Sequence, residues 1–376
     1  MKLVFVSNYF NHHQKPLAEA FIKEQRVDYT FIATSPVSES RKKLGYEDMD
    51  KSYEYVVRAY ESEEALEKSM ALCMDADVVI YGSCPIKFIK PRLKAKKPTF
   101  KYSERLFKSD AGNLKKLLFG IKFRQKEGKY KNNCLLCSSG YAAEDYNGIG
   151  AFRGRTYKWG YFPEFIEYGD ENKIAEEKTP DSIIWVGRFI DWKHPELAVN
   201  ALKFLRREGY DFDLTMVGNG EDYDKIIELV RQCGLDDKVK FVGSKPNHEV
   251  RLMLEKAQIA LITSDKKEGW GAIINESMNA CAAVICNKEV GAAPFLIEDG
   301  KNGFVYGSEE EFFAKLKTLA DDCVLREELG INAYKTIKTG WNASIAAERF
   351  VVLCESILKG EDTPFTEGIC SKADRK

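Results

Sequence analysis

Residues 182–208 read SIIWVGRFIDWKHPELAVNALKFLRRE, and the order of features in this stretch decides the fold. A short apolar run, Ile183–Val186, ends at the pair Gly187-Arg188. After a polar turn, an amphipathic pattern with helical spacing extends over Pro195–Glu208. A short apolar run bounded by glycine is typical of a buried strand. Strand, turn and helix in this order predict a parallel sheet covered on both faces.

The same alternation continues on both sides of this stretch, with amphipathic patterns such as Pro16–Gln25 and Glu63–Met74 between the strands. In the first half we expect strands at Lys2–Ser7, Tyr29–Ala33, Tyr53–Val57, Val78–Gly82, Thr99–Tyr102 and Leu135–Ser138. In the second half we expect them at Ile183–Val186, Leu214–Val217, Val239–Val242, Ile259–Ile262, Ala283–Cys286 and Phe304–Tyr306. The fold class is therefore α/β, with parallel sheets in two Rossmann-like domains.

A polar, acidic stretch without a clear period, residues 164–181, divides the chain of 376 residues into two parts of similar size. We predict an N-terminal domain of residues 1–163, a linker of residues 164–181 and a second domain of residues 182–340. Ligands bind beyond the carboxyl ends of the strands in open parallel sheets, so we expect both domains to aim those ends at a cleft between them. The polar tail after Gly360 is expected to be frayed.

The bulk composition excludes several classes of protein. A net charge of −1 gives no reason to expect a nucleic-acid partner. No apolar run approaches the ~18 residues that a transmembrane helix needs, and the N-terminal MKLVFVSNYF reads as a first strand and not as a signal peptide. The ten cysteines are scattered, and the lone CxxC of Cys134 and Cys137 lies in a strand-like run. We therefore expect buried, reduced thiols in a cytoplasmic protein.

The segment Ser264–Ala280, SDKKEGWGAIINESMNA, carries the chemistry in our interpretation. Glu268 lies in a polar loop after a strand, and Gly269 and Gly271 let a ligand approach the backbone closely. The helix that begins shortly afterwards carries Glu276, and free N–H groups at its start form an anion site. A carboxylate that can bind hydroxyls therefore lies beside amides that can bind phosphate, as a sugar phosphate requires. The alternative is an exposed acid and a glycine turn before an ordinary helix.

Three further elements of the second domain are consistent with a diphosphate site. Arg188 and Lys193 lie at the carboxyl end of a strand. The planar guanidinium of arginine and the compact ammonium of lysine both suit the binding of a diphosphate there. The stretch LTMVGNGEDYDKI contains the tight turn Gly218–Gly220 but lacks the third glycine of a dinucleotide fingerprint. The stretch KFVGSKPNHE is a strand followed by a turn that suits contact with a nucleotide base. A solvated basic turn and a plain glycine-rich turn are the alternative interpretations.

Taken together, the elements GR(x4)K, VGNG, FVG, EGWGAIINE and GAAPFLIEDGKNGFVY resemble those of retaining glycosyltransferases of family 4 (glycosyl transferases group 1), which have the GT-B fold. The resemblance spans about Ser182–Tyr306, and the N-terminal half is similar only in pattern. It implies an acceptor-binding first domain, a second domain that binds a nucleotide sugar, and a C-terminal helix, residues 341–359, that crosses back onto the first domain. It also implies transfer with retention of configuration, without a metal or other cofactor.

The resemblance also implies roles for the residues of the donor site. Arg188 and Lys193 would neutralise the diphosphate, and Glu268 would accept hydrogen bonds from the donor sugar; these three are the catalytic candidates. Glu276 would bind the ribose hydroxyls. The other donor-binding candidates would act through backbone groups or line the base pocket: Gly187, Gly218, Gly243, Ser244, Lys245, Gly269, Trp270, Gly271 and Ala272.

The first domain departs from the family pattern. His12 and His13 stand where many relatives have a glycine-rich loop, and Ser103 and Glu104 stand near the place of a cleft histidine. These four residues are candidates for contact with the acceptor or the cleft. The alternatives are a polar loop and helix cap for the two histidines, and an ion pair with Arg105 for Glu104.

The sequence gives little reason to expect a metal site. The triplets Asp75-Ala76-Asp77 and Asp211-Phe212-Asp213 both precede expected strands, at the edge away from the cleft. The four histidines show no zinc spacing.

Residues 108–131 combine apolar side chains with a strong excess of positive charge. The basic residues are Lys108, Lys115, Lys116, Lys122, Arg124, Lys126, Lys129 and Lys131, against Asp110 and Glu127. This composition suits a helix on an anionic membrane surface, which would place the protein peripherally on the inner membrane face and favour a lipid-linked acceptor. The alternative is a core-facing helix with a solvated basic side.

The predicted function is the transfer of a hexose-type sugar, with retention, from a nucleotide diphosphate sugar to a glycan or lipid-linked acceptor in cell-surface polysaccharide assembly. A UDP-sugar is the favoured donor. A sugar-nucleotide epimerase or phosphorylase on the same scaffold, and a non-catalytic nucleotide-sugar-binding protein, are the alternatives.

Overall fold

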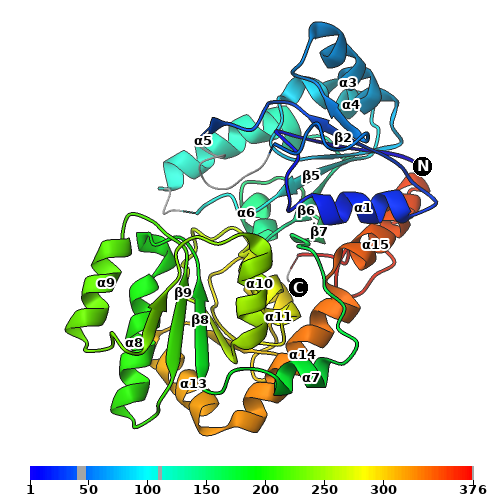
Figure 1. Ribbon diagram of the computed structural model, residues 1–376. Helices are drawn as coiled ribbons and strands as arrows, with labels where there is room; N and C mark the ends of the chain where they lie inside the picture. Colours follow the sequence, from blue (N-terminus) through cyan, green and yellow to red (C-terminus); the bar gives the residue numbers. More distant parts are fainter. Residues whose placement is uncertain (40–47, 109–111, 375–376) are drawn as a thin grey trace. The chain divides into compact units, whose positions relative to one another are not determined.

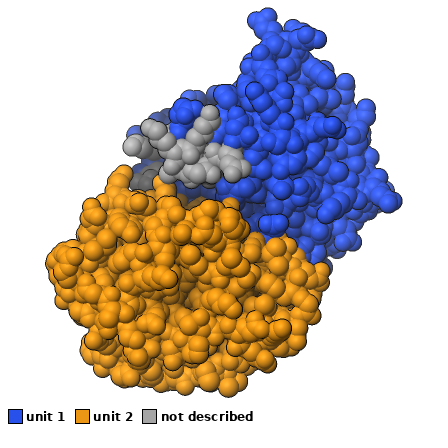
Figure 2. Space-filling model, in the orientation of Figure 1, with its two compact units in different colours: residues 1–164, 341–376 blue, residues 165–340 orange. Residues whose placement is uncertain are grey.

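The computed structural model describes residues 1–39, 48–108 and 112–374 of the chain. The chain forms two compact units, which Figure 2 shows in different colours. Unit 1 comprises Met1–Glu164 and Trp341–Lys376, and unit 2 comprises Phe165–Gly340. Each unit is built around its own parallel sheet (Figure 1).

Unit 1 contains a seven-stranded sheet with the order β3-β2-β1-β4-β5-β6-β7. Its strands are β1 (Lys2–Ser7), β2 (Asp28–Ala33), β3 (Val56–Arg58), β4 (Val78–Tyr81), β5 (Thr99–Ser103), β6 (Asn133–Cys137) and β7 (Thr156–Lys158). Every residue of β4 and of β6 is buried, as expected for parallel strands covered on both faces. The strand order reverses between β1 and β4, so the loops that follow these central strands are the expected place for a ligand.

The helices of unit 1 include the last long helix of the chain. They are α1 (Lys15–Lys23), α3 (Glu63–Asp75), α4 (Lys90–Lys94), α5 (Asn113–Phe123), α6 (Ala142–Gly148) and α15 (Ala343–Leu358), with the short turns η1 (Ile86–Phe88) and η2 (Arg124–Gly128). Helix α15 lies beside α1 (Figure 1), and the rings of Phe21 and Phe350 meet with centroids 5.8 Å apart. The chain therefore returns to unit 1 after unit 2, as the resemblance implied.

Unit 2 contains a six-stranded sheet with the order β10-β9-β8-β11-β12-β13. Its strands are β8 (Ser182–Val186), β9 (Asp213–Val217), β10 (Val239–Phe241), β11 (Ile259–Ile262), β12 (Ala283–Asn287) and β13 (Phe304–Tyr306). Its helices are α7 (Glu171–Glu176), α8 (Pro195–Arg207), α9 (Tyr223–Gln232), α10 (Asn247–Lys256), α11 (Ala272–Asn279), α12 (Ala293–Leu296), α13 (Glu309–Asp321) and α14 (Cys323–Gly340), with the turn η3 (Asp191–Lys193). Here the order reverses between β8 and β11.

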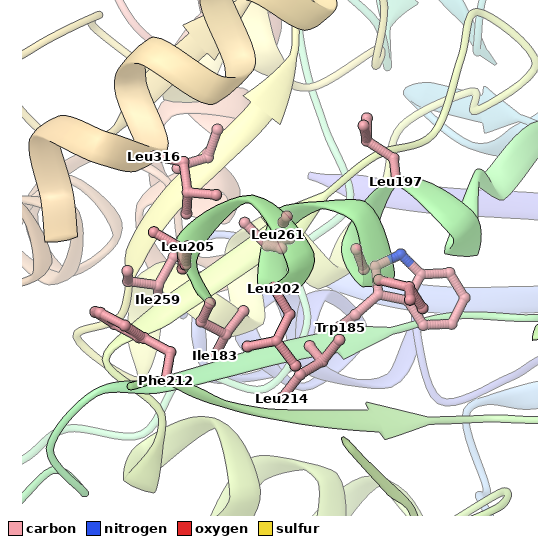
Figure 3. Close-up of a cluster of buried hydrophobic side chains, with 14 of the residues drawn as sticks. Ile183, Trp185, Leu197, Leu202, Leu205, Phe212, Leu214, Ile259, Leu261 and Leu316 are labelled. Atoms are coloured by element: carbon pink, nitrogen blue, oxygen red, sulfur yellow. The ribbon is translucent and has the colours of Figure 1, made fainter. Parts of the chain in front are cut away.

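One hydrophobic cluster seats α8 on the sheet of unit 2 (Figure 3). Helix α8 buries Leu197, Leu202 and Leu205, and the cluster also contains Ile183 of β8 and Leu214 of β9. Burying a side chain of this size stabilises the fold by about 1.5–3 kcal/mol. The packing therefore fixes α8 on the sheet, and with it the loop that joins β8 to α8.

A buried cation closes the N-terminal edge of the sheet in unit 1. Arg92 is 0% exposed. Its guanidinium donates to the carbonyl oxygens of Cys73 (3.1 Å), Ala76 (2.6 Å), Asp77 (2.5 Å) and Pro98 (2.7 Å). These carbonyls end α3 and precede β4 and β5, so one side chain satisfies backbone acceptors that would otherwise be buried without a partner. Burial lowers the pKa of Arg92 to about 10.

The stretch between the two predicted domains contains a helix that the sequence pattern did not show. From Phe165 onwards the chain belongs to unit 2, and Glu171–Glu176 forms α7. The side chain of Asp170 caps this helix by accepting from the amide of Asn172 at 3.0 Å. A helix of six residues is too short to display a period, which explains why the stretch reads as a linker.

The expectation of a frayed tail after Gly360 is wrong. Ile369, Cys370 and Ser371 are all 0% exposed. The amide of Lys158 donates to Ser371 O at 2.8 Å, and the amide of Cys370 donates to Lys158 O at 2.8 Å. The tail therefore pairs with β7, a strand of only three residues that sequence patterning also missed.

Most of the cysteines are buried, as the sequence predicted, whereas Cys84 and Cys233 are partly buried and Cys323 is exposed. All ten are free, and Cys134 and Cys137 are buried inside β6. Burial raises the pKa of Cys134 to about 11. These thiols are therefore poor nucleophiles at neutral pH.

We predict that Arg92→Met destabilises unit 1 by about 3 kcal/mol or more, because several buried carbonyls lose their donor at once. Urea denaturation followed by tryptophan fluorescence and circular dichroism would measure the loss. Lys94→Met, at an exposed position of the same helix, is the matched control and should change stability by no more than ~0.5 kcal/mol. Equal stability of the two variants would show that the arginine does not support the edge of the sheet.

Candidate functional site

Two glycines bring the turns at the carboxyl ends of β8 and β9 into backbone contact. Gly218 has a φ of +132°, and a Cβ at this position would lie 1.9 Å from Gly187 O. A Cβ on Gly220 would lie 2.3 Å from Phe189 O. Because side chains cannot fit there, these glycines serve the close approach of the two turns. The amide of Gly218 also donates to Gly243 O at 2.9 Å, which draws in the turn after β10.

A buried hydroxyl ties the turn after β8 to the turn after β11. Thr263 Oγ1 accepts from Trp185 Nε1 at 2.8 Å and donates to Lys193 O at 2.6 Å. The amide of Asp265 donates to Trp192 O at 3.0 Å, which adds a second link between the same two turns. The backbone of Lys193 is therefore held beside the loop that carries Glu268. Sequence reasoning did not identify Trp185 or Thr263, because nothing in the pattern of a buried strand marks a polar contact.

Lys193 and Glu268 form an ion pair at the carboxyl edge of this sheet. Lys193 Nζ contacts Glu268 Oε2, and each side chain is only 15% exposed. Ser264 Oγ lies 3.4 Å from the same carboxylate oxygen. Arg188 lies nearby on the same turn as Lys193, and both cations approach the ring of Trp192, with Arg188 Cζ 5.6 Å and Lys193 Nζ 4.9 Å from its centroid. Of the three residues that the sequence singled out as catalytic candidates, the structure thus joins Lys193 and Glu268 directly, and Arg188 approaches the same tryptophan ring as Lys193.

Helix α11 begins immediately after this pair. Gly271 is its N-cap with a φ of +89°, and a Cβ there would meet Val290 Cγ1 at 2.8 Å. No acidic side chain occupies the first turn, and Ile274 is the residue whose amide donates back to Gly271 O, at 2.9 Å. The preceding amides, including that of Ala272, have no acceptor within the helix, so with the helix dipole they can bind an anion.

Trp270 contributes packing to the site. Its side chain is 0% exposed, and its Nε1 donates to Asn275 Oδ1 at 2.8 Å. Its carbonyl accepts from the amide of Ala292 at 2.9 Å. Gly269, next to it, is also buried. The indole therefore anchors the loop in the core, and any contact of Trp270 with a ligand would be through its backbone.

Glu276 lies on α11, and its side chain is partly buried. Burial raises its pKa to about 7, against the opposing influence of the Arg251 charge. The far end of α11 is held by Lys178, which is 7% exposed and donates to Ala257 O at 2.9 Å and Ala280 O at 2.8 Å. A buried ammonium thus ties the ends of α10 and α11 together, a role that the sequence did not indicate.

The turn after β10 holds the candidates for the base pocket. Gly243 has a φ of +66°, and Ser244 and Lys245 are exposed. Lys245 Nζ lies 3.0 Å from Glu249 Oε2. Through the bond from the amide of Gly218, this turn lies next to the turn of β9.

The four candidates of unit 1 gather at the carboxyl ends of β1 and β5. The ring of His13 stacks on that of Tyr161 with centroids 5.9 Å apart, and the Tyr161 hydroxyl donates to Glu104 Oε1 at 2.6 Å. Glu104 also binds Lys108 through its other carboxylate oxygen. Tyr161 therefore joins His13 to Glu104. The sequence did not identify it, because it follows the short strand β7.

Charge and contacts at these positions suit the recognition of a hydroxyl. Burial and the neighbouring His12 lower the pKa of His13 to about 3, so its imidazole is neutral at physiological pH. The rings of His12 and His13 lie 4.0 Å apart. Ser103 Oγ and the Tyr146 hydroxyl are 2.8 Å apart, which turns the serine towards α6. Glu104 is paired with Lys108 and Tyr161, and Arg105 instead approaches Asp145 at 3.9 Å.

The Asp-x-Asp triplets have structural partners. Asp77 accepts from the amide of Lys2 at 2.7 Å. Lys238 lies 2.6 Å from Asp211 and 3.3 Å from Asp213. Among the residues that the structure describes, no group of three or more acidic, histidine or cysteine side chains has the arrangement of a metal site.

Comparison with known proteins agrees with this geometry. Residues 169–336 match the family model described as "Glycosyl transferases group 1". The chain is 31% identical over 137 residues to the putative colanic acid biosynthesis glycosyltransferase WcaL of Escherichia coli, covering 35% of this chain and 34% of that protein. It is 26% identical over 185 residues to the amylovoran biosynthesis glycosyltransferase AmsK of Erwinia amylovora, covering 47% of this chain and 45% of that protein. The chain thus aligns with less than half the length of these relatives.

Solved structures extend the likeness of fold to both units. Alr3699/HepE of Anabaena, solved in complex with UDP, superposes with a TM-score of 0.67 at 15% identity, covering 93% of this chain and 98% of that one. A glycosyltransferase of Rickettsia africae superposes with a TM-score of 0.66 at 15% identity, covering 96% of this chain and 99% of that one. The two Rossmann-like units therefore have the GT-B fold.

The raised pKa of Glu276 predicts a pH dependence of stability. The carboxyl group binds its proton more tightly in the folded chain, so its contribution to stability is lost as pH rises from about 4.5, its ordinary pKa, through about 7. We expect the free energy of unfolding of the wild type, relative to Glu276→Gln, to fall by roughly 1–2 kcal/mol between pH 4.5 and pH 8. Urea denaturation of both proteins across this range measures the difference. A difference that does not change with pH would mean that folding leaves the pKa of Glu276 at its ordinary value.

Proposed function

Because residues 169–336 belong to the glycosyl transferases group 1, we propose that the chain is a glycosyltransferase that acts with retention of configuration. Its donor would be a nucleotide diphosphate sugar carrying a hexose-type unit, and its acceptor a glycan or a lipid-linked glycan. The observation that carries the proposal is the ion pair of Lys193 and Glu268 beside the start of α11. This arrangement sets a cation and helix amides for phosphate beside a carboxylate for sugar hydroxyls.

The contacts of Glu268 are consistent with the recognition of a sugar. Lys193 and Ser264 both approach its Oε2. Oε1 can therefore accept a hydrogen bond from a donor-sugar hydroxyl while the first two contacts hold the carboxylate. Its low exposure strengthens such a charged hydrogen bond.

The proposed chemistry follows from the charges on this edge of the sheet. As the bond between the anomeric carbon and the diphosphate breaks, its electron pair passes to the leaving phosphate oxygen. Arg188, Lys193 and the first amides of α11 would stabilise that negative charge. The acceptor hydroxyl would form the new bond from the same face of the sugar, and its proton would pass to a phosphate oxygen. This scheme uses protein groups and the donor's own phosphate oxygen, and it needs no metal ion.

The choice of donor and pathway is also part of the proposal. UDP is favoured because Alr3699/HepE, which shares the fold, was solved with UDP. Assembly of a cell-surface polysaccharide is favoured because WcaL and AmsK are named for the biosynthesis of colanic acid and amylovoran. In unit 1, neutral His13 and the Tyr161–Glu104 pair are candidates for contact with the acceptor hydroxyl.

A thermal-shift panel of nucleotide sugars would test the donor. Stabilisation grows as RT ln(1 + [L]/Kd), so a UDP-sugar at a hundred times its Kd should add about 2.7 kcal/mol. Other bases with the same sugar should add less. Product analysis with the donor that stabilises most then separates transfer from phosphorolysis, epimerisation and binding without reaction. The absence of stabilisation by any nucleotide sugar would contradict the proposal.

We predict that Lys193→Ala lowers kcat for sugar transfer by about 10²–10³-fold, because a preorganised charge at the leaving phosphate is lost. Initial rates with the preferred donor measure the change. Lys267→Ala is the matched control, since Lys267 lies in the same region but pairs with the exposed Asp191 at 3.2 Å. It should retain nearly full activity. Equal activity of both variants would remove Lys193 from the mechanism.

A further inference from the structure

Helix α5 of unit 1 is held to the domain by one apolar face. A Cβ on Gly120 would lie 3.0 Å from Ile149 Cβ, so the helix packs closely there. Phe123 is 8% exposed, and its ring meets those of Tyr146 and Phe152 with centroids 5.3 and 5.8 Å apart. These contacts decide which side of α5 faces the protein.

A second apolar face of the same helix lies in solvent. Leu114 is 69% exposed, Leu117 60%, Leu118 59% and Ile121 49%. Their spacing of i, i+3, i+4 and i+7 places them along one stripe of the helix. A helix that packs on a globular domain by one face normally carries polar residues on the other. This stripe is therefore more apolar than the solvent-exposed face of a helix normally is.

The concentration of exposed apolar side chains is specific to α5. Among the described residues, nine large hydrophobic side chains are exposed, and α5 holds five of them, the fifth being Phe119 at 43%. The others, Ile22, Leu252, Val324 and Leu358, occur singly on different helices. Single exposed apolar residues need no explanation, whereas a contiguous patch marks an interaction site.

The charge around this stripe is positive. Lys122, Lys126, Lys129 and Lys131 are exposed, and within the described ranges none of them forms a salt bridge. Glu127, the one acidic residue of residues 113–131, is turned inward, where it pairs with Lys101 at 3.0 Å and accepts from a tyrosine hydroxyl. The same stretch of chain thus carries exposed leucines and exposed lysines that form no salt bridge within the described ranges. A surface of this kind is complementary to lipid phosphates above an acyl layer.

We propose that the outer stripe of α5 docks on an anionic lipid bilayer, with the leucines in the acyl boundary and the lysines at the phosphates. The helix has 11 residues, and no helix in the described part of the chain is long and apolar enough to cross a membrane. The contact is therefore interfacial and reversible. The docking itself does not depend on the proposed function. Only its purpose, which is to bring the enzyme to a lipid-linked acceptor, rests on that function.

Co-sedimentation of the full-length protein with vesicles tests the docking. The wild type should bind phosphatidylcholine vesicles that contain phosphatidylglycerol and should bind pure phosphatidylcholine at least ~10-fold more weakly. Replacing Leu114, Leu117, Leu118 and Ile121 together by serine should weaken binding to the anionic vesicles at least ~100-fold. Lys122→Gln combined with Lys126→Gln should weaken it several-fold, and raised salt should do the same.

The matched control replaces exposed apolar side chains outside α5 by serine. Leu252→Ser combined with Val324→Ser removes exposed apolar side chains from unit 2 and should leave vesicle binding unchanged. Because all these side chains are exposed, thermal unfolding of every variant should match the wild type. Binding that is as strong as that of the wild type after the serine changes or after the glutamine changes overturns the proposal. A dimer that forms without lipid and that the serine changes dissociate would also overturn the proposal. In that case a second copy of the chain, and not a bilayer, would cover the stripe.

An activity measurement separates this proposal from the proposed function. The serine variant should transfer sugar to a water-soluble acceptor at the wild-type rate and to an acceptor embedded in anionic vesicles at a much lower rate. If neither protein transfers sugar while vesicle binding still follows α5, the proposed function fails and the docking stands. Equal rates of both proteins on the embedded acceptor would overturn a role of docking in acceptor access.

Discussion

The hydroxyl of Thr263 is the contact on which the candidate site depends. It accepts a hydrogen bond from the Trp185 indole and donates one to the carbonyl of Lys193, so both of its polar capacities are used in a buried position. A buried hydroxyl that lost either partner would destabilise the fold, which makes the arrangement strongly preferred. Together with the hydrogen bond from the amide of Asp265 to Trp192 O, this hydroxyl sets where Lys193 lies relative to the loop of Glu268.

The rest of unit 2 keeps that geometry in place. Leucines of α8 seat the helix on the sheet, and Lys178 binds the carbonyl ends of α10 and α11. The glycine turns at Gly218 and Gly220 then let neighbouring loops come into backbone contact. Residues that could bind a diphosphate and a sugar are thus carried on elements that cannot shift independently, which is what preorganised charge stabilisation requires.

Unit 1 has the same kind of parallel sheet and carries a different group of candidate residues. Arg92 binds the carbonyls that precede β4 and β5, and the C-terminal tail pairs with the edge strand β7. His13 follows β1 and Glu104 follows β5, and Tyr161, which follows β7, joins the two. Helix α5 is attached to unit 1 by only one of its two apolar faces. The inner face packs on the domain through Gly120 and Phe123, and the outer face stays exposed.

Period and spacing in the sequence determined the class of fold, the six strands of unit 2 and the proximity of Arg188, Lys193 and Glu268 to the ends of strands, because local chain geometry governs all of these. Tertiary structure alone decided that Tyr161 joins His13 to Glu104, that Trp270 points into the core and that the polar tail pairs with β7. Each of these depends on partners that are distant along the chain, and a short strand or a six-residue helix carries no period of its own. The local pattern shows which residues stand at the edge of a sheet, and only the packed chain shows which of them meet.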